Sequence, residues 1–163
     1  MNLKSVEYSQ LTMALLMLPE HANPVGNVHG GEIMKLMDNT AGVVAHRHAR
    51  MQVVTLRVDE LEFLQPIRIG NLVMCHAKMT FVGRSSMEVA VEVTVEDLTK
   101  DEPAKTALTA YFTFVALDAQ GHSCPAPALE LITEDDRRLF EAGRQRYLNY
   151  KQRKNLMKQE GLS

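Results

Sequence analysis

A long amphipathic helix followed by four segments of strand character is the feature that most restricts the fold of this chain. Between Glu32 and Ala49, apolar residues recur at spacings of three and four, so one broad apolar stripe runs along a helix. The four segments that follow are each rich in β-branched or aromatic residues and are separated by turn-like residues. They are Val53–Phe63, Leu72–Val82, Met87–Asp97 and Thr106–Leu117. This pattern predicts an α+β fold in which an antiparallel sheet wraps around one helix.

Two further segments precede this unit. Polar and apolar residues alternate loosely from Val6 to Leu18, which predicts a first strand. The stretch from Leu18 to Gly31 then holds two prolines, three glycines and two asparagines, a composition typical of an ordered loop with a function. A sheet of this kind leaves its edge strands unpaired, so we expect a dimer.

The chain after Leu117 is expected to form an extension. Pro125 and Pro127 precede a second helix that begins near Thr133, where Thr133 and Asp136 resemble a capping box. Acidic residues open this helix and basic residues fill its far half, which suits the helix dipole. We therefore divide the chain into a main domain at residues 1–120 and a C-terminal extension with a basic helix at residues 121–163.

Composition excludes several classes of function. A chain of 163 residues with 18 Lys and Arg against 20 Asp and Glu has no global positive charge with which to bind nucleic acid or an anionic membrane. Its longest apolar runs, such as Met13–Leu18, are far shorter than the roughly 20 residues of a membrane span. Cys75 and Cys124 have no CxxC spacing, and the N-terminus lacks a signal-peptide pattern. We therefore expect a reduced, cytoplasmic protein.

The stretch from Asn23 to Asp38 contains the residues suited to chemistry. Gly30 and Gly31 lie at the predicted helix start, where free backbone N–H groups and the positive end of the dipole favour a developing oxyanion, although two glycines also suit a plain tight turn. Asp38 lies at the border of the apolar stripe, where a carboxylate can act as a general base or nucleophile or can simply pair with a cation in solvent. Asn23 can donate its amide to a carbonyl oxygen or form a turn.

The histidines give weaker evidence for a functional site. His29 precedes the helix and is either a donor or a structural residue. His46 and His48 are two residues apart and cannot share one helix face, so we reject a metal site there.

Three ordered blocks of sequence resemble one known family. The blocks are HANPVGNVHGGEIMKLMDNTAG, RVDELEFLQPIRIGNLV and FVGRSSMEVAVEV, and the similarity extends from about Leu11 to Leu117. They are similar to the cytoplasmic acyl-CoA thioesterases of the YciA and brain acyl-CoA hydrolase type. This resemblance implies the hotdog fold, a homodimer with a continuous sheet, and commonly a hexamer built as a trimer of dimers.

The resemblance also implies roles for particular residues. Asn23 and Asp38 match the catalytic pair, which meets across the dimer interface from opposite subunits. Gly30 and Gly31 match the segment whose amides receive the thioester oxygen, and Thr55 matches a supporting Ser or Thr position near the carboxylate. Hydrolysis of fatty acyl-CoA by these residues requires no metal or cofactor, since coenzyme A is part of the substrate.

The turn at residues 83–86 is a candidate coenzyme A contact. Gly83, Arg84, Ser85 and Ser86 offer backbone amides, two hydroxyls and a guanidinium for phosphate, although a plain hairpin would look similar.

Two other functions are compatible with the fold. In a β-hydroxyacyl thioester dehydratase or hydratase, His29 and Asp38 would move a proton on and off carbon. A non-catalytic acyl-CoA sensor would normally need an output domain, for which few residues are left outside the main domain.

Overall fold

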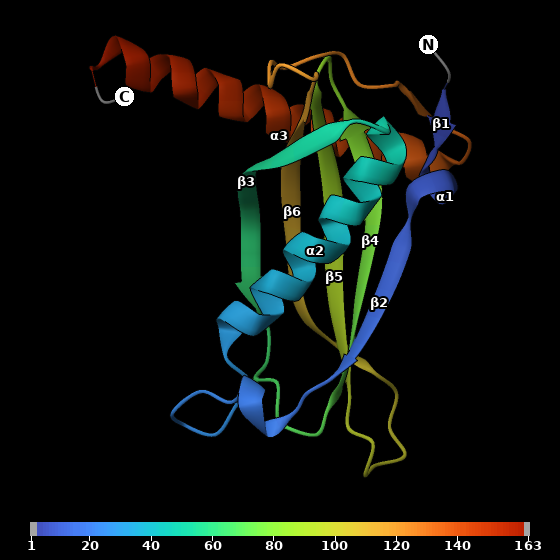
Figure 1. Ribbon diagram of the computed structural model, residues 1–163, viewed down its shortest axis with the longest axis vertical. Coiled ribbons are helices and arrows are strands. Elements are labelled where there is room, and N and C mark those ends of the chain that lie inside the picture. The colour runs from blue at the N-terminus through green and yellow to red at the C-terminus, as the bar shows by residue number, and fades with distance from the viewer. Residues whose placement is uncertain (1–2, 162–163) are drawn as a thin grey trace.

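Five strands form one antiparallel sheet in the order β2-β4-β5-β6-β3 in the computed structural model, which describes residues 3–161 (Figure 1). They are β2 (Leu11–Leu16), β3 (Gln52–Phe63), β4 (Leu72–Val82), β5 (Ser86–Glu96) and β6 (Lys105–Leu117). The four long strands begin and end within one residue of the predicted bounds, because turn-forming residues mark where each one ends. β2 and β3 are the two edges of the sheet.

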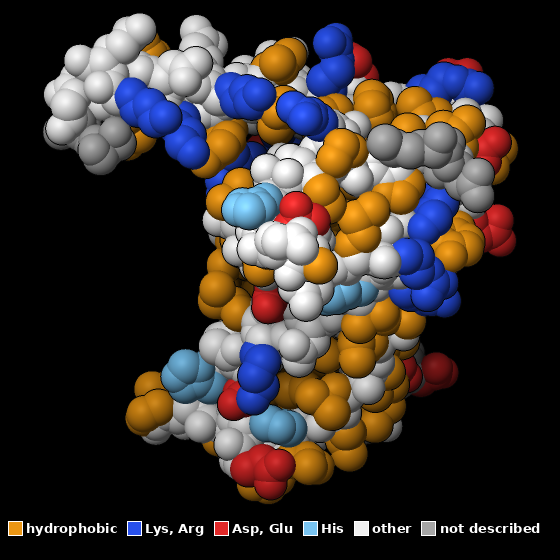
Figure 2. Space-filling model, turned by 45° about the horizontal axis from the view of Figure 1, so that its top comes forward, with side chains coloured by type: hydrophobic (Ala, Val, Ile, Leu, Met, Phe, Trp, Pro, Cys, Tyr) orange, Lys and Arg blue, Asp and Glu red, His pale blue; other side chains and the backbone are white. Residues whose placement is uncertain are grey.

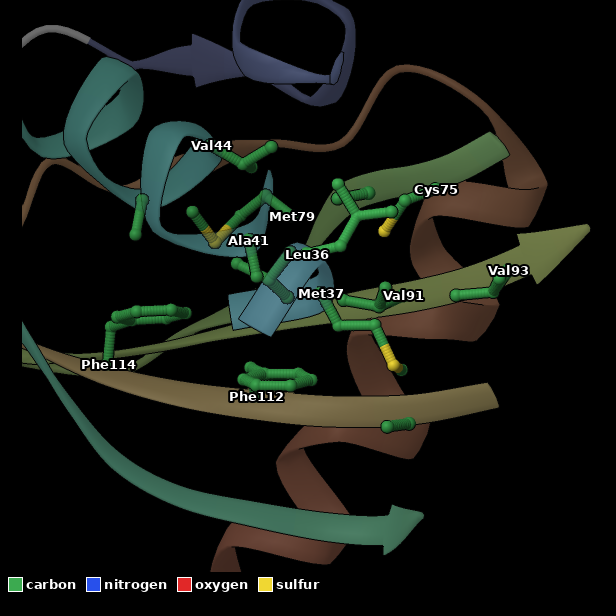
Figure 3. Packing of buried hydrophobic residues seen from close by; sticks show 14 of the residues in the cluster. Leu36, Met37, Ala41, Val44, Cys75, Met79, Val91, Val93, Phe112 and Phe114 are labelled. Atoms are coloured by element: carbon green, nitrogen blue, oxygen red, sulfur yellow. The ribbon is translucent and has the colours of Figure 1, made fainter. Parts of the chain in front are cut away.

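Helix α2 (Gly30–Ala49) packs diagonally across one face of the sheet (Figure 1). Its buried stripe includes Met37, Ala41 and Val44, which are fully buried. These side chains pack toward Phe112 and Phe114 of β6 in the centre of the core (Figure 3). The helix begins two residues before the predicted Glu32 and ends at Arg50, whose φ of 56° is left-handed.

Helix α3 (Glu134–Gln159) lies on the opposite face of the sheet (Figure 1). The predicted capping box is confirmed, because Asp136 N–H donates to Thr133 Oγ1 at 3.0 Å and Thr133 N–H donates to Asp136 Oδ2 at 2.9 Å. A short strand β7 (Leu129–Glu130) precedes α3 and pairs in parallel with β1 (Lys4–Ser5). Within residues 3–161, no helix has the length and apolarity needed to cross a membrane.

The predicted first strand from Val6 to Leu18 is wrong in its first part. Val6–Ser9 form a helical turn, α1, and only Leu11–Leu16 join the sheet as β2. The cause is local: Ser5 Oγ accepts the N–H of Tyr8 at 3.2 Å and so caps a helical turn. Loose alternation of polar and apolar residues did not reveal this competing side-chain bond.

Candidate active site

Asp38 and Thr55 form one half of the candidate site. Asp38 projects from the exposed side of α2, and Thr55 lies near the start of β3. The Thr55 hydroxyl donates a hydrogen bond of 2.8 Å to Asp38 Oδ1. This bond holds one carboxylate oxygen and leaves the other free to act on a substrate or on water.

Asn23 forms a turn and still keeps its amide donor. Its side-chain oxygen Oδ1 accepts the backbone N–H groups of Val25 and Asn27, each at 3.1 Å. Because Oδ1 is held by two donors, the orientation of the side-chain amide is fixed and Nδ2 is directed elsewhere. The two interpretations of Asn23, as a turn former and as a hydrogen-bond donor, are therefore compatible.

The two glycines at the start of α2 have different surroundings. Gly31 N–H donates to His29 Nδ1 at 2.9 Å, so His29 is the N-cap of the helix and its ring engages this amide. Gly30 N–H has no acceptor in the described part of the chain. A Cβ atom at Gly30 would lie 3.2 Å from the Phe63 ring, so the absent side chain leaves room beside that ring. Of the two glycines, Gly30 is therefore the one whose N–H is available to a ligand.

A small cleft joins Asn23 and Gly30. Its volume is about 230 Å³, and Ile33 and Phe63 contribute apolar walls. This is below the range of roughly 300–1,000 Å³ that is usual for a small-molecule site. One chain by itself therefore forms only part of a site for a long ligand.

The two halves lie at opposite ends of β3. Gly30 contacts the Phe63 end, whereas Thr55 lies near the Gln52 end. Eight residues of helix separate Gly30 from Asp38, which is an axial rise of about 12 Å. Asn23 and Asp38 of the same chain are consequently not brought together.

The turn at residues 83–86 lies at the Thr55 end of the sheet. Thr55 pairs with Phe114, which in turn pairs with Met87 just after the turn. Backbone carbonyls of the turn are occupied, because Arg84 accepts the N–H of Ala126 at 2.8 Å and Ser85 accepts that of Ala116 at 2.9 Å. The Arg84 side chain is exposed. Asp38, Thr55 and this turn thus share one end of the molecule.

Two residues of the site were missed or misjudged from sequence. From sequence, Phe63 is only the last residue of a predicted strand, and no local signal relates it to Gly30. The capping role of His29 has a signal, since it directly precedes the first helical residue, although histidine is not among the usual N-cap residues.

The Cys75 thiol is not a nucleophile candidate, because burial raises its pKa to about 11.

A helix wrapped by an antiparallel sheet, with a carboxylate on the helix and an amide donor in the preceding loop, points to acyl-transfer enzymes. Comparison with known proteins agrees: residues 25–101 match the model of the thioesterase superfamily. The human cytosolic acyl coenzyme A thioester hydrolase is 40% identical over 148 residues, which cover 90% of this chain and 39% of that protein. The chain therefore spans about two fifths of the length of that relative.

Solved structures extend the similarity over the whole fold. An acyl-CoA hydrolase from Staphylococcus aureus, in complex with butyryl coenzyme A and coenzyme A, is 30% identical with a TM-score of 0.87, covering 98% of this chain and 96% of that one. A hexameric thioesterase from Yersinia pestis is 34% identical with a TM-score of 0.67, covering 71% and 93%. This chain belongs to the thioesterase superfamily, and the predicted hotdog fold is confirmed.

The Staphylococcus aureus hydrolase has also been solved as three single alanine variants. The replaced residues are an asparagine, an aspartate and a threonine. The aspartate follows the asparagine by 15 residues, and the threonine follows the aspartate by 17.

Proposed function

We propose that this protein hydrolyses fatty acyl-CoA thioesters to a free fatty acid and coenzyme A, with Asp38 as the central catalytic residue. The observation that carries this proposal is the hydrogen bond from Thr55 to Asp38. Spacing supports it, because Asp38 follows Asn23 by 15 residues and Thr55 follows Asp38 by 17. These intervals equal those between the residues replaced in the Staphylococcus aureus hydrolase.

The complete site requires two subunits joined through β3. This edge strand exposes apolar side chains, with Val54, Leu56 and Phe63 each 47–51% exposed. Antiparallel pairing of two β3 strands around a twofold axis sets the Phe63 end of one beside the Gln52 end of the other. Asn23 and Gly30 of one subunit then approach Asp38 and Thr55 of its partner. A homodimer of this kind has two equivalent sites.

Each residue has a defined task in this site. Asn23 Nδ2 and the Gly30 amide donate to the thioester oxygen, where negative charge develops during attack on the carbonyl carbon. Gly31 can donate to the same oxygen only if its N–H breaks the hydrogen bond to His29 Nδ1. Asp38, oriented by Thr55, either removes a proton from water or attacks the carbonyl itself, and both uses need the same ionised carboxylate. Water and the substrate suffice for this chemistry, so we propose that no metal or cofactor takes part.

Coenzyme A would lie along the turn at residues 83–86. Arg84 is an exposed cation at the same end of the sheet as Asp38, and Ser85 and Ser86 add hydroxyls beside it. A guanidinium is well suited to phosphate. We further propose a trimer of such dimers, in line with the hexameric relative, and a cytoplasmic location, in line with the cytosolic human relative.

The decisive assay measures thiol release from acyl-CoA esters of increasing chain length. Asp38→Asn is expected to lower kcat by roughly a thousandfold while leaving the oligomer intact. Glu32→Gln is a matched control, because Glu32 is a carboxylate on the same helix that only pairs with Lys35 at 3.2 Å. Near-normal turnover in Asp38→Asn would remove Asp38 from the mechanism. A wild-type protein that releases no thiol would overturn the function and direct attention to a dehydratase assay.

Mixing two inactive variants tests whether each site combines residues of two subunits. Asn23→Ala and Asp38→Asn chains, unfolded together and refolded as mixed dimers, are expected to recover about a quarter of wild-type activity. This follows because half of the dimers are mixed and each mixed dimer has one intact site. If both residues of a site came from one chain, the mixture would stay inactive.

A further inference from the structure

Helix α3 runs across the strands of the sheet (Figure 1). Its side chains contact four strands that are neighbours in the sheet, through Phe81 of β4, Glu88 of β5, Tyr111 of β6 and Arg57 of β3. Phe140 packs on Phe81 of β4 with ring centroids 5.0 Å apart. Tyr150 stacks under the guanidinium of Arg57 of β3 at 3.6 Å. Ten residues of helix rise about 15 Å, which matches the three strand spacings of about 4.8 Å between β4 and β3.

The helix continues after the sheet has ended. Residues 151–159, here called the C-terminal arm, follow Tyr150 and are exposed throughout (Figure 1). Nine helical residues extend about 13 Å, enough to cover two further strands. The stripe that faces the sheet through Gly143, Arg146 and Tyr150 continues along the arm at Arg153, Lys154 and Met157.

The arm and the edge strand carry opposite charges, most of which form no salt bridge among residues 3–161. Lys151, Arg153, Lys154 and Lys158 make the arm basic, and Lys and Arg side chains line the projecting helix in Figure 2. Asp59, Glu60 and Glu62 make the C-terminal half of β3 acidic, and Asp59 pairs with Arg57 of the same strand. Among residues 3–161, none of the four arm cations and neither Glu60 nor Glu62 forms a salt bridge. Glu60 is exposed and has a φ of 52°, at a register shift of the edge strand between Asp59 and Glu62.

Within residues 3–161 of one chain, a groove beside this edge places Arg153 near Asp59 and Glu60 without a salt bridge between them. It has a volume of about 550 Å³ and lies between β3 and α3. Its lining residues are Asp59, Glu60, Arg146, Asn149, Gln152 and Arg153.

We propose that the C-terminal arm of each subunit lies across the partner subunit and fastens the dimer through the partner's acidic β3 residues. This inference rests on the β3-paired dimer proposed above. Arg57, over which α3 leaves the sheet, is close to the midpoint of Gln52–Phe63, where a twofold axis between two β3 strands would pass. The two arms then run antiparallel beside that axis, and each basic arm meets the acidic strand of the other subunit. Because the contact is isologous, every favourable pair occurs twice.

The arm thereby acts on the active site without touching substrate. The proposed site combines residues from two subunits, so a contact that lowers the dissociation constant of the dimer also keeps the site assembled at low protein concentration. The contact is electrostatic and exposed, so it should weaken as salt is raised.

Removal of residues 152–163 is the direct test. This truncation retains the contacts of Phe140, Arg146 and Tyr150 with the sheet, so we expect the fold to be preserved. Sedimentation and subunit exchange between differently labelled chains are expected to show a dimer dissociation constant raised at least tenfold. A dissociation constant equal to that of the full chain would overturn the proposal.

Charge reversal tests the pairing itself. Arg153→Glu with Lys154→Glu, and separately Glu60→Lys with Glu62→Lys, are each expected to weaken the dimer at least fivefold, and the four changes together should restore most of the loss. Losses that simply add would overturn the pairing. Arg137→Glu with Arg138→Glu is the matched control, since these residues lie at the start of the same helix and pair only with Glu134 and Asp135.

The readout is independent of catalysis. A dimer that depends on the arm but releases no thiol from acyl-CoA would contradict the proposed function alone. An active enzyme whose dimer dissociation constant is the same with and without the arm would contradict this inference alone.

Discussion

The two long helices are attached to the two faces of the sheet in different ways. Helix α2 buries nine residues, most of them apolar, in the central core. Helix α3 is longer, yet in the part of the chain that the structure describes Gly143 is its one buried residue. Apolar burial thus fixes α2, whereas α3 depends on a few specific contacts. The carboxylate that we propose as catalytic, Asp38, lies on α2, and the arm that we propose to contact the partner subunit lies on α3.

The contacts of α3 centre on Glu88. This residue is only 3% exposed, and its carboxylate accepts hydrogen bonds from Thr80 Oγ1 at 2.8 Å and from Arg146 at 2.8 and 2.9 Å. Arg146 also stacks on Tyr111 at 3.6 Å. Gly143 brings the helix backbone close, because a Cβ there would lie 2.7 Å from both Glu88 Oε1 and Phe81 Cβ. A buried charge is stable here because its partners are all present.

The largest effect is expected from a cavity under α2. Met37 is fully buried, so Met37→Ala should lower the free energy of unfolding by about 3 kcal/mol through lost burial and the space left behind. Met34→Ala on the same helix is the control, since Met34 is 39% exposed and should cost far less. Denaturant unfolding at a fixed protein concentration measures both. Equal losses would mean that α2 is not held by its apolar stripe.

The second-largest effect on stability is expected from the buried carboxylate of Glu88. Glu88→Gln keeps a side chain of the same shape but removes the charge that Arg146 needs, and should cost about 2 kcal/mol. Hydrogen exchange should show the loss of protection concentrated in α3. Glu92→Gln is the matched control on the same strand, because Glu92 is exposed and bonded only to Thr106 Oγ1. Uniform loss of protection in α2 and α3 would refute the contrast between the helices.

Gly143→Ala tests the close approach of α3. Alanine would normally stabilise a helix by about 1 kcal/mol relative to glycine. Here the added Cβ must displace Phe81 or Glu88, so we expect a net loss of about 1 kcal/mol instead. The sign of the change in the denaturation midpoint decides between these outcomes. Asn149→Ala, on the same helix, should not destabilise the protein.

The smallest effect is the dependence of stability on pH that we expect from His48. His48, near the end of α2, donates from Nε2 to the carbonyl of Pro127 at 2.8 Å, and its Nδ1 has no partner among the described residues. Burial lowers the pKa of His48 below its ordinary 6.5. The unfolded chain therefore takes up a proton that the folded chain does not, so stability is present above about pH 6.5 and falls as the pH drops below it.

The pH prediction is checked by unfolding at a series of pH values. His48→Gln should reduce the slope of stability against pH between pH 6.5 and 5. His122→Gln, which changes an exposed histidine, should leave the slope unchanged. The same slope in all three proteins would show that His48 does not titrate differently on folding.

Local sequence patterns predicted the long helices and strands of this protein, but not the short elements α1, β1 and β7. Helical periodicity defined α2, turn residues bounded the four long strands, and the capping box defined the start of α3. These signals are local, since each depends on residues within a few positions of one another. The same locality explains the error at Val6–Ser9, where one side-chain hydrogen bond outweighed a weak alternation.

How distant residues meet depends on the tertiary structure, and of these meetings the family resemblance implied only that of Thr55 with Asp38. Thr55 reaches Asp38 because β3 lies beside α2, and Phe63 borders Gly30 because the same strand returns to the helix start. The path of α3 over four strands, and its continuation beyond β3, depend on Glu88, Gly143 and Arg57 in combination. These contacts join residues that are far apart in the chain, so no local pattern encodes them, and packing of the whole sheet selects them.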